Sequence, residues 1–161
     1  MSLFSRRFLL MLPLVLAACG FTPVYAPGGT ASALRGKVEV AAPESVDSYL
    51  LVQNLEERLG RPNPAVYKLS LVLATGAQGQ AITASNETTR YSVVGKVDYE
   101  LIEIAGDDVI ATGSIDNFTG YSATGSTVET LAAERDAHER LMVILADQIT
   151  TRLYSTTDLP Q

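Results

Sequence analysis

Residues 90–101 read Arg-Tyr-Ser-Val-Val-Gly-Lys-Val-Asp-Tyr-Glu-Leu, and apolar and polar side chains alternate along most of this stretch. A period of two places successive side chains on opposite faces of a β-strand. One set is apolar and consists of Tyr91, Val93, Val97, Tyr99 and Leu101. The other set is polar and consists of Arg90, Ser92, Lys96, Asp98 and Glu100. One buried face and one wet face are typical of an antiparallel sheet that is covered on a single side.

Segments on both sides of this stretch also have the pattern of strands. Residues 37–40 alternate as a short strand, and residues 67–73 place Tyr67, Leu69, Leu71 and Leu73 on one face. The polar residues that follow, including Gly76, Gly79 and Asn86, predict a loop. Ala105-Gly106-Asp107-Asp108 predicts a turn into a last strand at about residues 109–121.

Two segments have the spacing of amphipathic helices. In residues 44–59, Val52, Leu55 and Leu59 recur at three- and four-residue intervals, with Ser48 and Leu51 beside them. Pro43 suits the first turn of this helix, and Gly60-Arg61-Pro62 ends it. A second helix begins at Ser126-Thr127-Val128-Glu129, where Ser and Glu three residues apart form a capping box. Its apolar face consists of Leu131, Leu141, Leu145, Ile149 and Leu153, widened by Val128, Met142 and Ile144.

The predicted element order is therefore β-α-β-β-β-α. Two amphipathic helices can cover one face of a four-stranded mixed sheet, so the sequence predicts an α+β fold, a two-layer sandwich. We expect one domain at residues 36–155 and a C-terminal tail at residues 156–161.

The N-terminus has the three parts of an export signal. Arg6 and Arg7 precede an apolar run, which ends at Leu16-Ala17-Ala18-Cys19. This is the lipobox pattern, which predicts a signal peptide at residues 1–18 and a lipid on the Cys19 sulfur. A transmembrane anchor is the alternative, but the run is shorter than the roughly 20 residues that a bilayer requires. The twin-arginine and general export routes both remain open.

The residues after the cysteine indicate how the mature protein is held at the membrane. Residues 19–35 are rich in Pro, Gly and small side chains, which predicts an irregular lipidated tether. Gly20 replaces the aspartate that retains lipoproteins in the inner membrane, so we expect an outer-membrane location. Loss of Arg6 and Arg7 changes the formal charge from −6 to about −8, which argues against binding to nucleic acid. Membrane binding then depends on the acyl chains.

No pattern of catalytic residues appears in the sequence. His138 is the only histidine, and the position four residues later is Met142, so the zinc-protease motif lacks its second ligand. Nucleophile-elbow and phosphate-loop motifs are absent from the sequence as well. We therefore expect no enzyme activity, no metal and no cofactor. Arg90 and Lys96, with Lys68, should project from the wet face of the sheet, either toward an anionic ligand or simply into solvent.

Two segments resemble a known family. Residues 16–25, with Cys-Gly-Phe-x-Pro-Val-Tyr, resemble the start of the lipopolysaccharide-assembly lipoprotein LptE of alphaproteobacteria. Residues 121–153, especially 131–140 and 145–149, resemble the C-terminal helix of the same family. The resemblance implies a lipoprotein that plugs the outer-membrane barrel LptD, assists its assembly and helps insert lipopolysaccharide into the outer leaflet. The resemblance also implies that Cys19 carries the lipid and that Gly20 is the sorting residue. Some members bind lipopolysaccharide through basic residues, but Arg90 and Lys96 are candidates for such contact here on the strand alternation alone. The alternative is a free periplasm-facing lipoprotein that binds a small ligand or an envelope partner without an obligate barrel.

Overall fold

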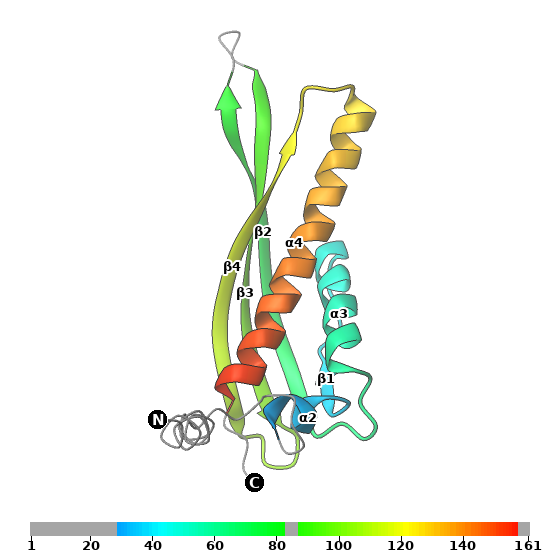
Figure 1. The fold of residues 1–161 in the computed structure, drawn as a ribbon, viewed down its shortest axis with the longest axis vertical. Helices are drawn as coiled ribbons and strands as arrows, with labels where there is room; N and C mark the ends of the chain where they lie inside the picture. The colour runs from blue at the N-terminus through cyan, green and yellow to red at the C-terminus, as the bar shows by residue number, and fades with distance from the viewer. Residues whose placement is uncertain (1–28, 83–86, 158–161) are drawn as a thin grey trace, which may run out of the picture.

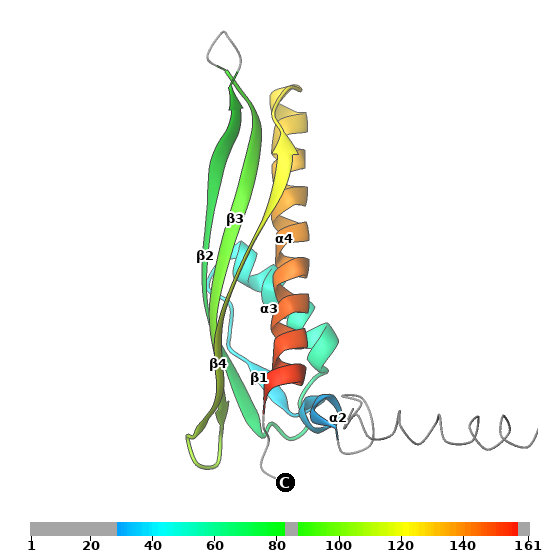
Figure 2. The same cartoon turned by 60° about the vertical axis from the view of Figure 1, so that its left-hand side comes forward.

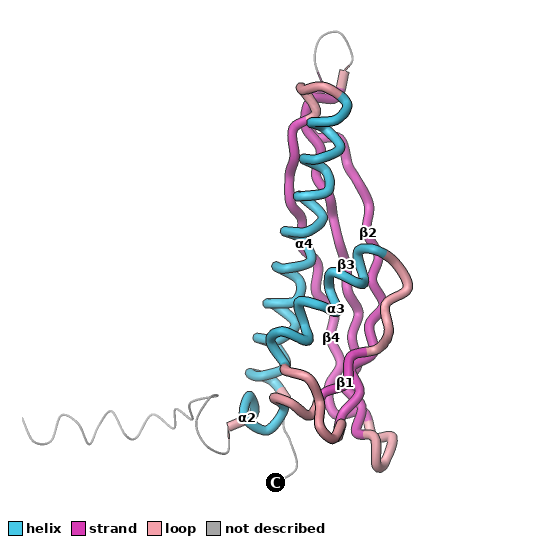
Figure 3. The backbone as a smooth tube through the Cα atoms, turned by 90° about the vertical axis from the view of Figure 1, so that its right-hand side faces the viewer, coloured by secondary structure: helices cyan, strands magenta, loops and turns pink. Residues whose placement is uncertain are grey.

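The computed structural model describes residues 29–82 and 87–157 of the chain. Figures 1 and 3 show an elongated molecule in which the helices run beside a long sheet. The elements are α2 (Thr30–Leu34), β1 (Val38–Val40), α3 (Val46–Leu59), β2 (Tyr67–Ile82), β3 (Thr88–Glu103), β4 (Val109–Ser122) and α4 (Thr127–Thr156).

The sheet has four strands in the order β1-β2-β3-β4. β1 pairs with β2 in parallel, whereas β2–β3 and β3–β4 are antiparallel, so the sheet is mixed. Helices α3 and α4 lie on the same face of this sheet, as Figure 2 shows. The predicted α+β two-layer sandwich is confirmed.

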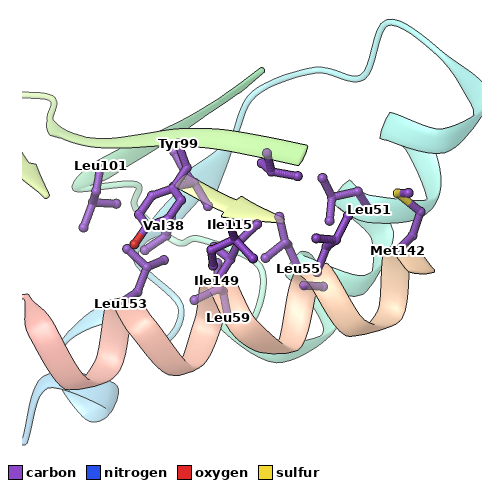
Figure 4. Close-up of a cluster of buried hydrophobic side chains, with 14 of the residues drawn as sticks. Val38, Leu51, Leu55, Leu59, Tyr99, Leu101, Ile115, Met142, Ile149 and Leu153 are labelled. Atoms are coloured by element: carbon purple, nitrogen blue, oxygen red, sulfur yellow. The ribbon is translucent and has the colours of Figure 1, made fainter. Parts of the chain in front are cut away.

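The core lies between the sheet and the two long helices (Figure 4). Leu141, Leu145, Ile149 and Leu153 of α4 are fully buried, as the spacing predicted. The inner face of β3 supplies Val93, Val97, Tyr99 and Leu101, also buried. Gly95 interrupts this face because α4 approaches closely there. A Cβ on Gly95 would lie 3.1 Å from Leu141 and 3.1 Å from Leu145.

The loop predicted around Gly76 and Gly79 is wrong, because both residues lie inside β2. Gly76 pairs with Val94 of β3, and Gly79 pairs with Tyr91. Glycine has little intrinsic preference for strands, but pairing with a regular neighbouring strand overrides that preference. Asn86, the third residue of the predicted loop, lies outside the described residues.

Part of the tether predicted at residues 19–35 is helical rather than irregular. Thr30–Leu34 form the short helix α2, in which Ala31 and Leu34 are buried. Helix α2 packs near the C-terminal end of α4 (Figure 1), so the folded body includes residues that precede the predicted domain.

The ends of the long helices follow their capping residues. Helix α3 begins at Val46 rather than at Glu44, because Ser45 and Ser48 form a capping box that the prediction missed. In α4, the predicted box of Ser126 and Glu129 is confirmed. Leu131 was expected in the core but is 48% exposed, and Val128 is also exposed, because α4 extends beyond the elements that cover it.

Candidate functional site

The outer face of the sheet carries both basic residues that the strand pattern singled out. Arg90 lies between Ala81 of β2 and Ser122 of β4, and Lys96 lies between Ala74 and Asp116. Both are exposed, as predicted. The two residues are six positions apart along β3, a separation of roughly 20 Å at about 3.3 Å per residue. The structure therefore places the two cations on one face but does not bring them together.

Lys96 lies among acidic and hydroxyl side chains. Its Nζ is 3.3 Å from Oδ1 of Asp98, and Asp116 is its cross-strand neighbour. A hydrogen bond from Ser114, followed by the bond from Lys96, lowers the pKa of Asp98 from its ordinary value. Asp98 therefore stays ionised beside Lys96, so much of the positive charge of Lys96 is already balanced within the protein.

Arg90 lies instead in a shallow concavity at the end of the outer face farthest from α2. This distal concavity has a volume of about 510 Å³ and is lined by Gln80, Ala81, Arg90, Ser92, Phe118, Gly120, Tyr121 and Ser122. No carboxylate is among these lining residues. In residues 29–82 and 87–157, Arg90 makes no ion pair. Its guanidinium is thus available to an anionic group.

One exposed aromatic side chain, Phe118, lines the distal concavity together with Arg90. Phe118 is 65% exposed, so it is a surface residue rather than part of the core. Tyr91 and Tyr121 stack on the opposite, inner face, with ring centroids 5.4 Å apart. Tyr99 is buried, as expected of a core residue. An exposed aromatic ring next to a cation and hydroxyls suits a ligand with both apolar and anionic parts.

His138 has a partner that the sequence did not reveal. Its Nδ1 lies 2.9 Å from Oδ2 of Asp47 in the first turn of α3. The Thr75 hydroxyl of β2 donates to the same carboxylate oxygen at 2.9 Å. Because the hydroxyl is bonded to the carboxylate and not to the imidazole, the three residues lack the order of a catalytic triad. The arrangement instead ties α3 to both α4 and the sheet.

Cys19 and Gly20, the predicted lipid-attachment and sorting residues, lie outside the described residues. In the part of the chain that the structure describes, no group of three His, Cys, Asp or Glu side chains is placed to hold a metal ion. The described helices include none with the length and apolar character needed to cross a bilayer.

Comparisons with known proteins agree with this architecture. The family model described as LptE, lipopolysaccharide-assembly, matches residues 36–153. No curated protein matches the sequence. A protein from Caulobacter crescentus CB15 described as a lipoprotein has a similar structure, with a TM-score of 0.65 and 24% identity over 78% of this chain and 93% of that one.

Two further solved structures share the fold. Rare lipoprotein B from Shewanella oneidensis has a TM-score of 0.56 and 12% identity, covering 74% of this chain and 93% of that chain. Lipoprotein B from Nitrosomonas europaea has a TM-score of 0.59 and 13% identity, covering 75% and 83% of the two chains. At these identities the structural likeness shows the fold alone.

Proposed function

Because this chain belongs to the LptE lipopolysaccharide-assembly family, we propose that it is an outer-membrane lipoprotein that plugs an LptD-type β-barrel. In this role it assists assembly of the barrel and takes part in inserting lipopolysaccharide into the outer leaflet. The observation that carries the proposal is the family match over residues 36–153, which includes α3, every strand of the sheet and all but the last three residues of α4. The role is one of assembly and binding, without catalysis.

The shape of the molecule suits insertion into a barrel from one end. Helix α2, where the described chain begins, and the C-terminal end of α4 lie together, and the β2–β3 hairpin lies at the opposite end (Figure 1). The 30 residues of α4 span about 45 Å at 1.5 Å per residue. A lipid on Cys19 would hold the α2 end at the periplasmic surface of the outer membrane, with Gly20 permitting sorting there. The distal end would then reach into the barrel.

The outer sheet face suits the interior of a barrel. Its exposed side chains are mostly small or polar, among them Ala74, Thr112 and Ser114. The interior of an outer-membrane barrel is also polar, in contrast to its lipid-facing exterior. Contact between two such surfaces requires no large apolar patch on the plug.

The distal concavity is the part of the surface where lipopolysaccharide would bind. Arg90 would pair with a phosphate of the glycolipid, and Phe118 would contact an apolar portion. Lys96 would contribute less, because Asp98 already holds its ammonium group.

Pull-down of the tagged full-length protein from detergent-solubilised outer membrane tests the proposal. We expect recovery of a large β-barrel protein at roughly one copy per copy of the lipoprotein. Recovery of the lipoprotein alone, from membranes that contain the intact barrel, would contradict the plug and favour a free lipoprotein that binds a small ligand or another envelope partner.

A further inference from the structure

The edge of β2 is paired over only a small part of its length. β1 pairs with β2 from Tyr67 to Leu69, and then leaves the sheet at Ala41. Strand β2 continues to Ile82. In residues 29–82 and 87–157, no strand occupies this edge beyond Leu69. Most of β2 therefore presents an open edge on the side away from β3.

The direction of the backbone groups follows from the β1 pairing. Tyr67 donates its N–H to the Lys37 carbonyl, and the Leu69 carbonyl accepts from Ala41, so odd-numbered residues of β2 direct their backbone groups toward β1. Alternation along the strand extends this pattern to Leu71, Leu73, Thr75 and Ala77. These residues offer N–H and C=O groups to an incoming strand. Natural proteins usually protect such edges with Lys, Pro or bulges, and residues 70–78 contain none of these.

A groove lies beside this edge where β1 departs. It has a volume of about 510 Å³ and is lined by Ala41, Ala42, Pro43, Glu44, Ser45, Ser48, Leu51, Val52, Ser70, Leu71, Val72 and Leu73. Leu51 and Val52 are buried core residues of α3, so the groove has an apolar wall. A strand added to β2 would place alternate side chains toward this wall. Backbone pairing combined with a side-chain pocket is the arrangement by which sheet edges bind extended peptides.

The charges around the groove limit which segment can occupy it. Glu44 is the one charged residue of its lining, and residues 70–82 of β2 have no charged side chain. A segment with apolar side chains and a basic residue near Glu44 would be complementary. The chain's own residues 19–28 carry no basic side chain. A second copy paired through β2 would likewise offer no cation from residues 70–82.

We propose that the β2 edge from Ser70 to Ala77, with the adjoining groove, binds an extended segment of the barrel partner as an added β-strand. The segment has alternating apolar side chains and a Lys or Arg opposite Glu44. β1 already pairs with this edge as a parallel strand at Tyr67 to Leu69. The added segment would pair with the next part of β2, beside the point where β1 ends. The inference rests on the proposed barrel partnership and specifies one surface through which it acts.

The test is photocrosslinking in intact cells from a benzoylphenylalanine placed at Val72, which is 70% exposed beside the groove. We expect an adduct of barrel size, whose crosslinked peptide is extended and contains a basic residue. The exposed Ala42 supplies a matched pair of variants. Ala42→Trp fills the groove and should lower the adduct yield about tenfold, the effect of roughly 1.4 kcal/mol, whereas Ala42→Ser should not. Thermal melting checks that both variants fold.

If Ala42→Trp fails to fold, Glu44→Lys replaces it. Its control is Glu57→Lys, the same charge change at an exposed residue outside the groove lining. The charge reversal at Glu44 should lower the yield about fivefold, the effect of roughly 1 kcal/mol expected of a surface ion pair. Wild-type pull-down runs in parallel. If the barrel is recovered but Val72 gives no adduct, or gives one with a second copy or with residues 19–28, the strand-addition inference is wrong while the plug stands. If no barrel is recovered, the proposed function fails, and the inference fails with it.

Discussion

The Nδ1 atom of His138 on α4 lies 2.9 Å from Oδ2 of Asp47 on α3, although 91 residues separate the two in the sequence. Both side chains are mostly buried, with 26% and 18% exposure for His138 and Asp47. Asp47 also accepts from Thr75 at 2.9 Å. A single carboxylate therefore connects the first turn of α3 to the middle of α4 and to β2.

Removal of this carboxylate should loosen the start of α3. Asp47→Ala leaves the His138 ring and the Thr75 hydroxyl without their partner, and we expect a loss of about 1–2 kcal/mol in the free energy of unfolding. Asp47→Asn keeps an acceptor oxygen and should cost less. Chemical denaturation of both variants measures the difference. Equal stability of Asp47→Ala and the wild type would show that the contact contributes nothing.

Gly113 of β4 lies directly beside Tyr99 of the neighbouring strand β3, and the Tyr99 ring lies over it. A Cβ at Gly113 would lie 2.5 Å from the Tyr99 ring, and Tyr99 is only 2% exposed, so the ring has little room to move. Gly113→Ala should therefore destabilise the protein by about 1–3 kcal/mol through overpacking. Gly120→Ala is the control on the same strand, because its Cβ would meet no atom closer than 3.6 Å. Similar melting temperatures for the two variants would contradict the steric argument.

The sequence predicted elements whose side chains repeat with a strong period. Residues 90–101 and the Leu141-to-Leu153 face were found because most of their buried positions carry large apolar side chains. The second half of β2 was missed because its small residues have no such period, and only the partner strand β3 makes it a strand. Helix α2, with 5 residues, is too short for a periodic signal.

The candidate site could be predicted only in part. Alternation placed Arg90 and Lys96 on the outer face, but the distance that separates them depends on the unbroken length of β3. The pairing of Lys96 with Asp98 had a signal in the sequence, since residues two apart share a strand face. The contact between Asp47 and His138 had no signal in the sequence, because it depends on how two helices are placed relative to each other.

A charge on the inner face of α4 should unfold the domain. Leu145 is fully buried and packs where Gly95 lets the helix approach the sheet. Leu145→Asp would place a carboxylate there without a partner, at a cost of several kcal/mol. Gln148→Asp, at an exposed position of the same helix, is the control. Circular dichroism during heating compares the two, and retained cooperative melting of Leu145→Asp would contradict the assigned core.

Loss of the Cys19 sulfur should block lipidation without affecting the fold. The buried core of the described residues begins at Ala31, twelve positions later in the chain, and we expect Cys19→Ala to leave the domain folded. We expect the variant to keep its signal peptide and to migrate at the size of the precursor. Mass spectrometry of the membrane-bound protein detects both the missing acyl groups and the retained residues 1–18. Maturation to normal size would show that the lipobox interpretation is wrong.

Arg90 and Lys96 should differ in their effect on lipopolysaccharide binding. Arg90 lies in the distal concavity with no carboxylate among its lining residues, whereas the Lys96 ammonium group is 3.3 Å from Asp98. Arg90→Ala should therefore weaken binding about tenfold, corresponding to the roughly 1.5 kcal/mol of a hydrogen bond to a charged group. Lys96→Ala, the matched loss of one cation from the same face, should have a much smaller effect. Titration of each purified variant with lipopolysaccharide at fixed salt measures the two affinities. Equal losses would mean that overall charge, and not the distal concavity, governs the contact.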